Sequence, residues 1–240
     1  MTLSLMNQLG IETVFVNQII KVKPLKQSKK QSVVVESDWS SASYFYSIVA
    51  LSEIGSEIRL SSYKKESIQG DAILVSIYKH FGVETTFSGS TVVLKKVTQS
   101  NNKHLKLDLN KAPDIAQTIA VTSFGLGISC ELLGLHTLKI KETDRLEALQ
   151  KELTKLGAHI SITNNSLYLE SNSILHPNIS IETTINQYIL HTYQLNSDIS
   201  LLLRDLVLIN AEEQLIVENI NLGVFENILQ GNVPITPPFN

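Results

Sequence analysis

Hydrophobic and polar positions along the chain follow one pattern that occurs three times. Each time, a stretch with helical spacing ends at a glycine, a strand of alternating residues follows, and a polar turn leads into a second strand. The glycines are Gly10, Gly82 and Gly157. A helix stops readily at such a position, because glycine enters the left-handed conformation at no steric cost. The pattern therefore predicts three helix–hairpin segments, with Ser88-Gly89 and Asn164-Asn165 as the turn pairs of the last two.

The two later segments each extend upstream into a longer repeat. Residues 33–96 and residues 105–171 both read as a strand, a helix, a second strand, a second helix and a hairpin, so each unit is β-α-β-α-β-β. In the last helix of the second unit, Leu146, Leu149 and Leu153 form a one-sided apolar stripe, which is typical of a helix packed on a sheet. The strands predicted outside the hairpins are 32–37, 56–62, 105–109 and 136–140, and the predicted helices are 40–55, 70–82, 113–127 and 142–157.

The two ends of the chain contain less than a whole unit. Residues 1–32 supply only the closing helix and hairpin of a preceding unit, so we expect the chain to start within a domain. The stretch 23–32 is rich in lysine and contains a proline, which predicts a domain boundary near residue 32. Residues 172–240 open with a strand-like stretch and then become rich in asparagine, leucine and isoleucine. They are interpreted as a degenerate third unit of the second domain, 33–240.

Composition narrows the classes of function. The 240 residues are 43% hydrophobic, enough for a core, and 20 basic against 23 acidic residues give a net charge of −3. This charge disfavours a nucleic-acid-binding protein, and no apolar stretch is long enough to predict a membrane-spanning helix. The single cysteine, Cys130, lies in an apolar stretch, which fits a buried thiol in a reducing cytoplasm. The six histidines lack the spacing of metal ligands and no dinucleotide or phosphate-loop motif occurs, so we expect no metal and no cofactor.

The densest group of charges is the run from Lys141 to Arg145, between a predicted strand and a predicted helix. Two interpretations are open. In the structural one, Glu142 or Thr143 caps the helix and the acidic residues interact favourably with the helix dipole. In the chemical one, the run lies at a strand-to-helix turn, where α/β proteins collect ligands, and Glu142 and Arg145 share one helical face. Asp114, which follows Pro113, has the same two interpretations. Pro-Asp is ordinary in the first turn of a helix; in the chemical interpretation Asp114 lies at the same sort of turn one half-unit earlier, and both carboxylates face one cleft if the strands of the unit lie side by side.

Four motifs carry a family resemblance: ESDWSSASYF, SIQGD, LNKAPDIAQTIAV and KIKETDRLEALQKELTKLGA. Together they resemble the EPSP synthases (3-phosphoshikimate 1-carboxyvinyltransferases) of the shikimate pathway, over roughly residues 1–171. The resemblance implies an inside-out α/β barrel of the enolpyruvyl transferase type, with two lobes of three β-α-β-α-β-β units each. It also implies transfer of the enolpyruvyl group from phosphoenolpyruvate to the 5-hydroxyl of shikimate 3-phosphate, in aromatic amino acid biosynthesis. The family needs neither metal nor organic cofactor, binds neither nucleic acid nor membrane, and is typically cytoplasmic and monomeric.

The matching motifs also imply roles for individual residues. Asp114 would be the base for the 5-hydroxyl proton and would contact shikimate 3-phosphate. Glu142 would lie by the phosphoenolpyruvate methylene group and assist proton transfer there. Lys141 would contact the shikimate substrate, and Arg145 would bind phosphoenolpyruvate, because a planar guanidinium suits a carboxylate or phosphate. Some members of the family have an asparagine shortly before the KETDR run, and in this sequence Thr137 stands nearest to that place.

Other parts of the family pattern are not found. The basic motifs of the first lobe would precede residue 1, and the stretch IETTINQYILHTYQLNSDIS lacks the aspartate-histidine-arginine motif expected there. Three hypotheses follow. The chain is a partial or degenerate EPSP synthase with impaired enolpyruvyl transfer, a noncatalytic fragment that binds shikimate 3-phosphate or a partner chain, or a transferase that becomes active with a separate N-terminal fragment.

Overall fold

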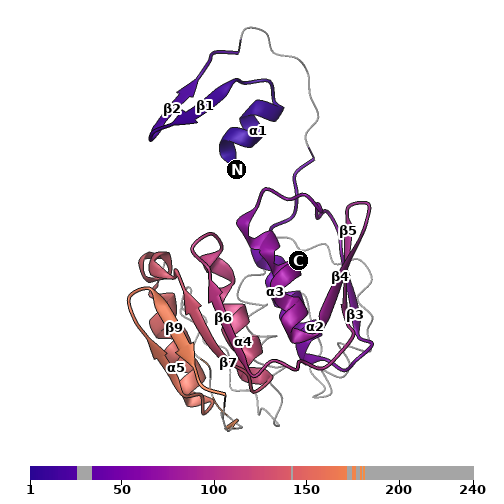
Figure 1. Ribbon diagram of the computed structural model, residues 1–240, viewed down its shortest axis with the longest axis vertical. Coiled ribbons are helices and arrows are strands. Elements are labelled where there is room, and N and C mark those ends of the chain that lie inside the picture. The colour runs from indigo at the N-terminus through magenta and orange to yellow at the C-terminus, as the bar shows by residue number, and fades with distance from the viewer. Residues whose placement is uncertain (26–33, 142, 172–174, 177–178, 180, 182–240) are drawn as a thin grey trace, which may run out of the picture.

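The computed structural model describes residues 1–25, 34–141, 143–171, 175–176, 179 and 181 (Figure 1). Nearly all of the predicted third unit, 172–240, lies outside these residues, as does the predicted boundary near residue 32. The described residues form an N-terminal helix with a hairpin and, beyond it, two segments that each contain a β-sheet.

The N-terminal residues confirm the first predicted helix and hairpin. Helix α1 (Thr2–Gln8) is followed by the antiparallel strands β1 (Thr13–Val16) and β2 (Ile19–Val22). Gly10, with a φ of 81°, lies between helix and hairpin. The two turn residues, Asn17 and Gln18, both have positive φ, as a two-residue hairpin turn requires.

Residues 34–96 form a three-stranded antiparallel sheet with helices packed against it. The strand order is β3-β5-β4. The predicted helix 70–82 consists of three short helical segments, and it ends as expected at Gly82, whose φ is 80°. The elements are α2 (Trp39–Leu51), β3 (Glu57–Leu60), the 3₁₀ helix η1 (Gly70–Ile73), α3 (Leu74–Ile77), the 3₁₀ helix η2 (Tyr78–Phe81), β4 (Val83–Ser88) and β5 (Thr91–Lys96).

Residues 34–37 form no strand, so the prediction of a strand at 32–37 is wrong for the part of that stretch that the structure describes. Polar contacts hold this segment where a neighbouring strand would otherwise do so. The Glu36 carboxylate accepts hydrogen bonds from the Trp39 indole N–H at 2.8 Å and from the Lys64 backbone N–H at 3.0 Å. The Ser37 backbone N–H donates to the Ser62 carbonyl at 2.7 Å.

Residues 104–171 form a four-stranded mixed sheet in the order β6-β7-β9-β8. Strands β6 and β7 are parallel, and β9 pairs antiparallel with both β7 and β8. The elements are β6 (His104–Asp108), the 3₁₀ helix η3 (Pro113–Ile115), α4 (Ala116–Gly125), β7 (Ser129–Leu133), the 3₁₀ helix η4 (His136–Ile140), α5 (Arg145–Lys155), β8 (Ile160–Ile162) and β9 (Ser166–Leu169).

The strand predicted at 136–140 is also wrong, because that stretch is the 3₁₀ helix η4. The strand of this half-unit is β7, which lies earlier in the sequence and alternates between buried and partly buried residues. Gly134, with a φ of 79°, follows β7 and turns the chain away from the sheet. One turn also differs: Ser88 pairs with Thr91, so the β4–β5 turn residues are Gly89 and Ser90.

The two sheets share one pairing scheme. In each sheet, the second strand of the hairpin lies in the middle and pairs antiparallel with two neighbours: the first hairpin strand and a strand from earlier in the sequence. In the first sheet β5 pairs with β4 and β3. In the second sheet β9 pairs with β8 and β7. Gly82 and Gly157, with φ of 80° and 99°, precede the two hairpins. The second sheet also has the parallel strand β6, for which the described part of the first segment has no counterpart.

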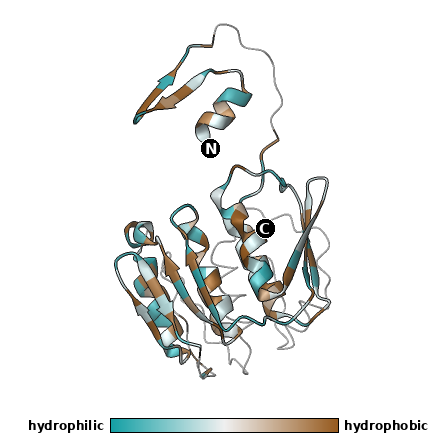
Figure 2. Ribbon diagram, in the orientation of Figure 1, coloured by the Kyte–Doolittle hydropathy of each residue, from teal (hydrophilic) through white to brown (hydrophobic). Residues whose placement is uncertain are grey.

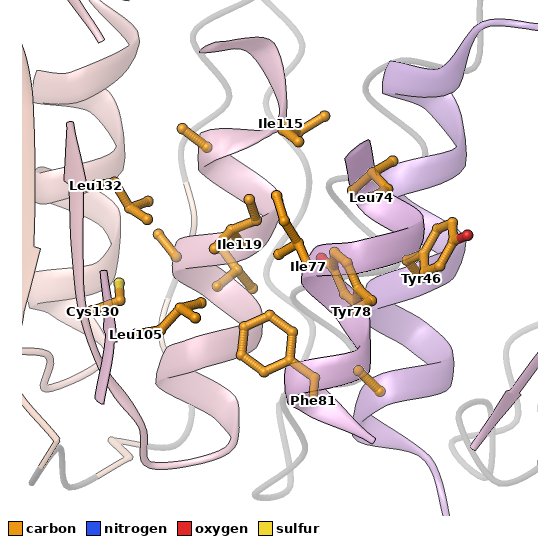
Figure 3. Packing of buried hydrophobic residues seen from close by; sticks show 14 of the residues in the cluster. Tyr46, Leu74, Ile77, Tyr78, Phe81, Leu105, Ile115, Ile119, Cys130 and Leu132 are labelled. Atoms are coloured by element: carbon orange, nitrogen blue, oxygen red, sulfur yellow. The ribbon is translucent and has the colours of Figure 1, made fainter. Parts of the chain in front are cut away.

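Helices α2 and α4 form the centre of the core. They pack against each other, and both are buried on nearly all sides. Figure 3 shows Ile77, Tyr78 and Phe81 next to Ile119 of α4, with Cys130 beyond α4. The predicted buried thiol is confirmed, since Cys130 is 0% exposed and unpaired. Helix α5, by contrast, carries both hydrophobic and hydrophilic residues (Figure 2), with its leucine stripe turned inward as predicted.

Three buried hydroxyl groups join the helices inside this core. The Ser47 Oγ lies 2.7 Å from the Tyr78 OH and 2.6 Å from the Thr122 Oγ1, and the latter two oxygens are 3.0 Å apart. Each hydroxyl therefore has hydrogen-bond partners although water is excluded. The triad fixes α2, η2 and α4 relative to one another.

Candidate functional site

Asp114 lies in the first turn of the helical stretch that leads into α4. Strand β6 ends at Asp108, and the following turn is held by hydrogen bonds from the Leu109 N–H to the Leu133 carbonyl at 2.8 Å and from the Ala112 N–H to the Leu109 carbonyl at 2.9 Å. Pro113 begins η3, where its fixed φ suits a helix start. The fully buried Ile115 anchors this helical turn, so the carboxylate of Asp114 is left at its surface.

Lys141 and Arg145 flank the start of α5. The 3₁₀ helix η4 ends at Ile140, and α5 begins at Arg145. The N-cap is Asp144, whose Oδ1 accepts from the backbone N–H groups of Leu146 and Glu147, both at 3.1 Å. The prediction that Glu142 or Thr143 caps this helix is therefore wrong.

The structure brings three of the four predicted site residues together. The Lys141 Nζ lies 3.1 Å from the Asp114 Oδ1 and 3.4 Å from its Oδ2. The Arg145 Nη1 lies 3.5 Å from the same Oδ1. About a third of the Asp114 and Lys141 side chains and a fifth of the Arg145 side chain remain exposed. Glu142 lies outside the described residues, so its expected place in the same cleft stays a prediction.

This cluster can both bind an anion and accept a proton. Two cationic groups share one carboxylate, and all three side chains remain reachable from solvent. A phosphate or carboxylate that arrives here can form charge-assisted hydrogen bonds with the lysine and the arginine. Asp114, which shares them, would then be the nearest described proton acceptor.

A further carboxylate, Asp71, lies within electrostatic range of this cluster and was not proposed from the sequence. Its Oδ2 accepts a hydrogen bond from the Ser40 Oγ at 2.5 Å. Burial raises the pKa of Asp71; the hydrogen bond from Ser40 lowers it, the charges of Asp114 and Asp38 raise it, and Lys141 lowers it. The available signal was its position at the end of SIQGD, a motif of the family resemblance that was given no site residue.

Side-chain contacts tie the SIQGD segment to the start of α2. The Gln69 Oε1 accepts from the Trp39 backbone N–H and its Nε2 donates to the Ser37 carbonyl, both at 2.9 Å. Asp38 caps α2 by accepting from the Ser40 N–H at 3.0 Å. Asp71 and Gln69 are therefore both held against α2.

Among the described residues, no group of three histidine, cysteine or acidic side chains is placed to hold a metal ion. Within the same residues, no helix is both long enough and apolar enough to cross a bilayer.

Comparison with known proteins identifies the family. The family model described as EPSP synthase (3-phosphoshikimate 1-carboxyvinyltransferase) matches residues 1–188. The chain belongs to the EPSP synthase family. The resemblance stated from the four motifs is thereby confirmed, and the match includes Asp114, Lys141 and Arg145.

Relatives in this family are considerably longer than this chain. A 3-phosphoshikimate 1-carboxyvinyltransferase of Bacteroides fragilis is 38% identical over 168 residues, which are 70% of this chain and 40% of the relative. One from Buchnera aphidicola subsp. Cinara cedri is 33% identical over 166 residues, 67% of this chain and 36% of the relative. The chain thus spans about two fifths of the length of these EPSP synthases.

A solved structure supports the fold. The EPSP synthase from Acinetobacter baumannii matches with a TM-score of 0.53 at 18% identity, over 70% of this chain and 40% of that one. At this identity the likeness concerns the fold alone. The predicted α/β class is confirmed, and the described residues share the α/β fold of EPSP synthases.

Proposed function

We propose that this chain takes part in transferring the enolpyruvyl group from phosphoenolpyruvate to the 5-hydroxyl of shikimate 3-phosphate, with Asp114, Lys141 and Arg145 at the reacting groups. The observation that supports this most is the contact of one carboxylate with two cationic groups, at 3.1 Å and 3.5 Å, at the starts of two helical stretches. Membership of the EPSP synthase family supports the class of reaction.

Asp114 is the proposed proton acceptor. Its Oδ1 is shared by Lys141 and Arg145. Bound phosphate and carboxylate groups compete for both cations, which frees the carboxylate to accept the 5-hydroxyl proton. The hydroxyl oxygen then bonds to the carbon of phosphoenolpyruvate that carries the phosphate, while the double bond opens and the methylene carbon takes up a proton. Loss of a proton from the resulting methyl group restores the double bond as the bond from carbon to the phosphate oxygen breaks. In the net reaction, the 5-hydroxyl proton is released together with inorganic phosphate.

Lys141 and Arg145 are the proposed anion ligands. Lys141 contacts the shikimate substrate, where a compact point charge suffices, and Arg145 binds phosphoenolpyruvate through its planar fork. Glu142, adjacent to Lys141 in the sequence, is proposed to assist proton transfer at the methylene group. Electrostatic stabilisation of this kind commonly supplies much of the rate enhancement of an enzyme.

The proposed architecture is a two-lobed inside-out barrel. Residues 1–32 would close the first lobe, and residues 33–240 would form the second. The shared pairing scheme of the two sheets supports repeated units within the second lobe. Substrates bound between the lobes would then also contact residues of the first lobe, because the two reacting anions carry more charge than Lys141 and Arg145 alone balance. We therefore propose that enolpyruvyl transfer by this chain alone is impaired.

A second candidate is a fragment that acts with another chain carrying the rest of the enzyme. The N-terminal hairpin favours it, because large apolar residues on both of its strands are more than half exposed, including Phe15 at 63% and Ile19 at 59%. A two-stranded hairpin with exposed apolar faces is marginally stable by itself. A complementary chain would cover it.

The decisive experiment measures phosphate release from phosphoenolpyruvate and shikimate 3-phosphate by the purified chain, with and without the unmatched part of the Bacteroides fragilis relative. Asp114→Asn is the test variant. Glu131→Gln is the matched control, because it removes another carboxylate–lysine pair, to Lys106 at 2.9 Å, on β7. We expect transfer only with the added part, and loss of transfer in Asp114→Asn but not in Glu131→Gln.

Binding is tested separately by calorimetry with shikimate 3-phosphate. We expect wild-type chain and Glu131→Gln to bind alike, and Lys141→Met to bind more weakly. Full transfer by the chain alone would refute the proposed impairment. Neither turnover nor binding, in a chain with a folded circular-dichroism spectrum, would refute the proposed function.

A further inference from the structure

We propose that Gly70 is a positioning residue for Asp114, acting through the backbone of the turn 109–112. The inference rests on the proposed function of Asp114. It concerns a contact between two segments of the chain that are about forty residues apart in the sequence, and it gives the glycine of SIQGD a role that its place at a helix start does not require.

Gly70 touches the backbone of Lys111. A Cβ atom at position 70 would lie 2.1 Å from the Lys111 carbonyl oxygen and 3.3 Å from its carbonyl carbon. Non-bonded carbon and oxygen atoms cannot approach to 2.1 Å, so any side chain at position 70 must displace one of the two backbones. The φ of Gly70 is not in the left-handed region, so the close approach, and not the backbone conformation, requires glycine here.

The backbone on either side of Gly70 has little freedom to move. Gln69 is bonded to the Trp39 N–H and the Ser37 carbonyl, both at 2.9 Å, and Asp71 accepts the short hydrogen bond from Ser40. Both neighbours of Gly70 are therefore tied to the start of α2. A displacement forced at position 70 passes mainly to the turn 109–112.

The same turn is in contact with a second glycine. A Cβ atom on Gly134 would lie 2.5 Å from the Asn110 backbone nitrogen and 2.7 Å from the Asn110 Cγ. Close backbone approaches from two separate segments therefore define where the turn lies. Gly134 also has a φ of 79°, so a substitution there combines two effects and is less informative than one at position 70.

Displacement of Lys111 reaches the carboxylate three residues later. Pro113, with its restricted φ, and the buried Ile115 make the connection to Asp114 stiff. The distances from Asp114 to Lys141 and Arg145, 3.1 Å and 3.5 Å, are already longer than those of typical charge-assisted hydrogen bonds. A shift of about 1 Å breaks this geometry and is enough to impair a site.

The test is Gly70→Ala, with Gly82→Ala as the matched control. Gly82 closes the same helical run and makes a similar approach at the other end of it, with its Cβ position 2.0 Å from the Thr98 carbonyl oxygen. Its φ of 80° adds backbone strain, so Gly82→Ala is the harsher substitution and controls for a general loss of stability. The readouts are the carboxyl carbon NMR signal of Asp114, identified by its loss in Asp114→Asn, and the affinity for shikimate 3-phosphate. Circular dichroism and the melting temperature report the fold.

We expect Gly70→Ala to move the Asp114 signal and to weaken substrate binding by about tenfold or more. Gly82→Ala should lower the melting temperature and leave the Asp114 signal and the affinity of the folded protein unchanged. An unmoved signal in folded Gly70→Ala, or an equal movement in Gly82→Ala, overturns the proposal. Because the signal is read without substrate, a wild-type chain that fails to bind shikimate 3-phosphate refutes the proposed function and leaves this test intact.

A milder variant covers the case in which Gly70→Ala does not fold. Gln69→Met keeps the length of the side chain and removes its bonds to Trp39 and Ser37, which loosens Gly70 against Lys111. We expect a smaller movement of the Asp114 signal away from its wild-type position. A folded Gln69→Met protein with the wild-type signal also overturns the proposal.

Discussion

Lys96 offers a sharp test of the packing, because a lysine side chain that is 0% exposed lies inside the first unit. Its Nζ donates to the Ala50 carbonyl at 2.6 Å and to the Phe81 carbonyl at 2.7 Å. These carbonyls belong to the last turns of α2 and η2, where no further helical N–H group follows to pair with them. The ammonium group therefore caps two helical segments at once, where the helix dipole favours a cation.

The substitution Lys96→Met keeps much of the volume and removes both hydrogen bonds. Each bond from a charged donor contributes about 1.5–3 kcal/mol, and each carbonyl would be left buried without a partner. The desolvation of the ammonium group, which methionine avoids, offsets part of this loss. We expect the free energy of unfolding to fall by about 2 kcal/mol or more. The control is Lys95→Met, since Lys95 is the exposed neighbour on the same strand.

The pH dependence supplies a second, independent measurement. Burial lowers the pKa of Lys96 below its ordinary 10.5, so the unfolded chain binds this proton more tightly than the folded one. The contribution of Lys96 to the free energy of unfolding therefore rises as the pH rises from its folded pKa toward 10.5. Urea unfolding, followed by circular dichroism at several pH values, should show a difference between wild type and Lys96→Met that grows with pH over this window. Equal stability of the two proteins at neutral pH would refute the capping role, and a difference that shrinks with rising pH would refute the lowering of the Lys96 pKa by burial.

Three further outcomes are expected. Gly157→Val should lower the free energy of unfolding by more than about 1 kcal/mol in the same urea assay, because a β-branched residue is strained at a φ of 99°; wild-type stability would contradict the helix-ending role. Compared with wild type, Asp71→Asn should gain more in melting temperature at pH 7 than at pH 3, because burial raises the pKa of Asp71 and the wild type loses the stabilising, protonated form as the pH rises through that value; a gain that is equal at both pH values would contradict this. Cys130, which is fully buried with a thiol pKa raised to about 12, should react with a thiol reagent only after denaturation, and rapid labelling of the native protein would be inconsistent with the packing.

The sequence predicted the elements whose local signals agree with their tertiary surroundings. Gly82 and Gly157 end helical runs where expected, because a single glycine is enough to allow the left-handed conformation. The leucine stripe of α5 faces inward because one-sided burial imposes a helical period. The two misplaced strands have no such local signature. Apolar composition alone does not distinguish β7 from the stretch 136–140, and only pairing with β6 and β9 decides between them.

The same limit applies to the candidate site. Asp114, Lys141 and Arg145 could be proposed because they stand at strand-to-helix turns and match family motifs, and the fold brings them within 3.5 Å. Asp71 was missed because its importance depends on Ser40, thirty-one residues away, and on the charge cluster nearby.

Contacts of backbone with backbone are the least visible in a sequence. Glycine can be required at a position because the backbone there is left-handed, or because neighbouring atoms leave no space for a Cβ atom. The sequence alone does not distinguish these two reasons. Gly70 stands at the start of a helical run, where small and polar residues such as serine and glycine are common, so the sequence gives no reason to single it out. Only the carbonyl of Lys111, 2.1 Å from the missing Cβ, separates the two explanations. If Asp114 is the proton acceptor, the position of its carboxylate depends on Gly70, which has no reactive side chain. The role of Asp114 in proton transfer and the role of Gly70 in positioning therefore have to be tested with different variants.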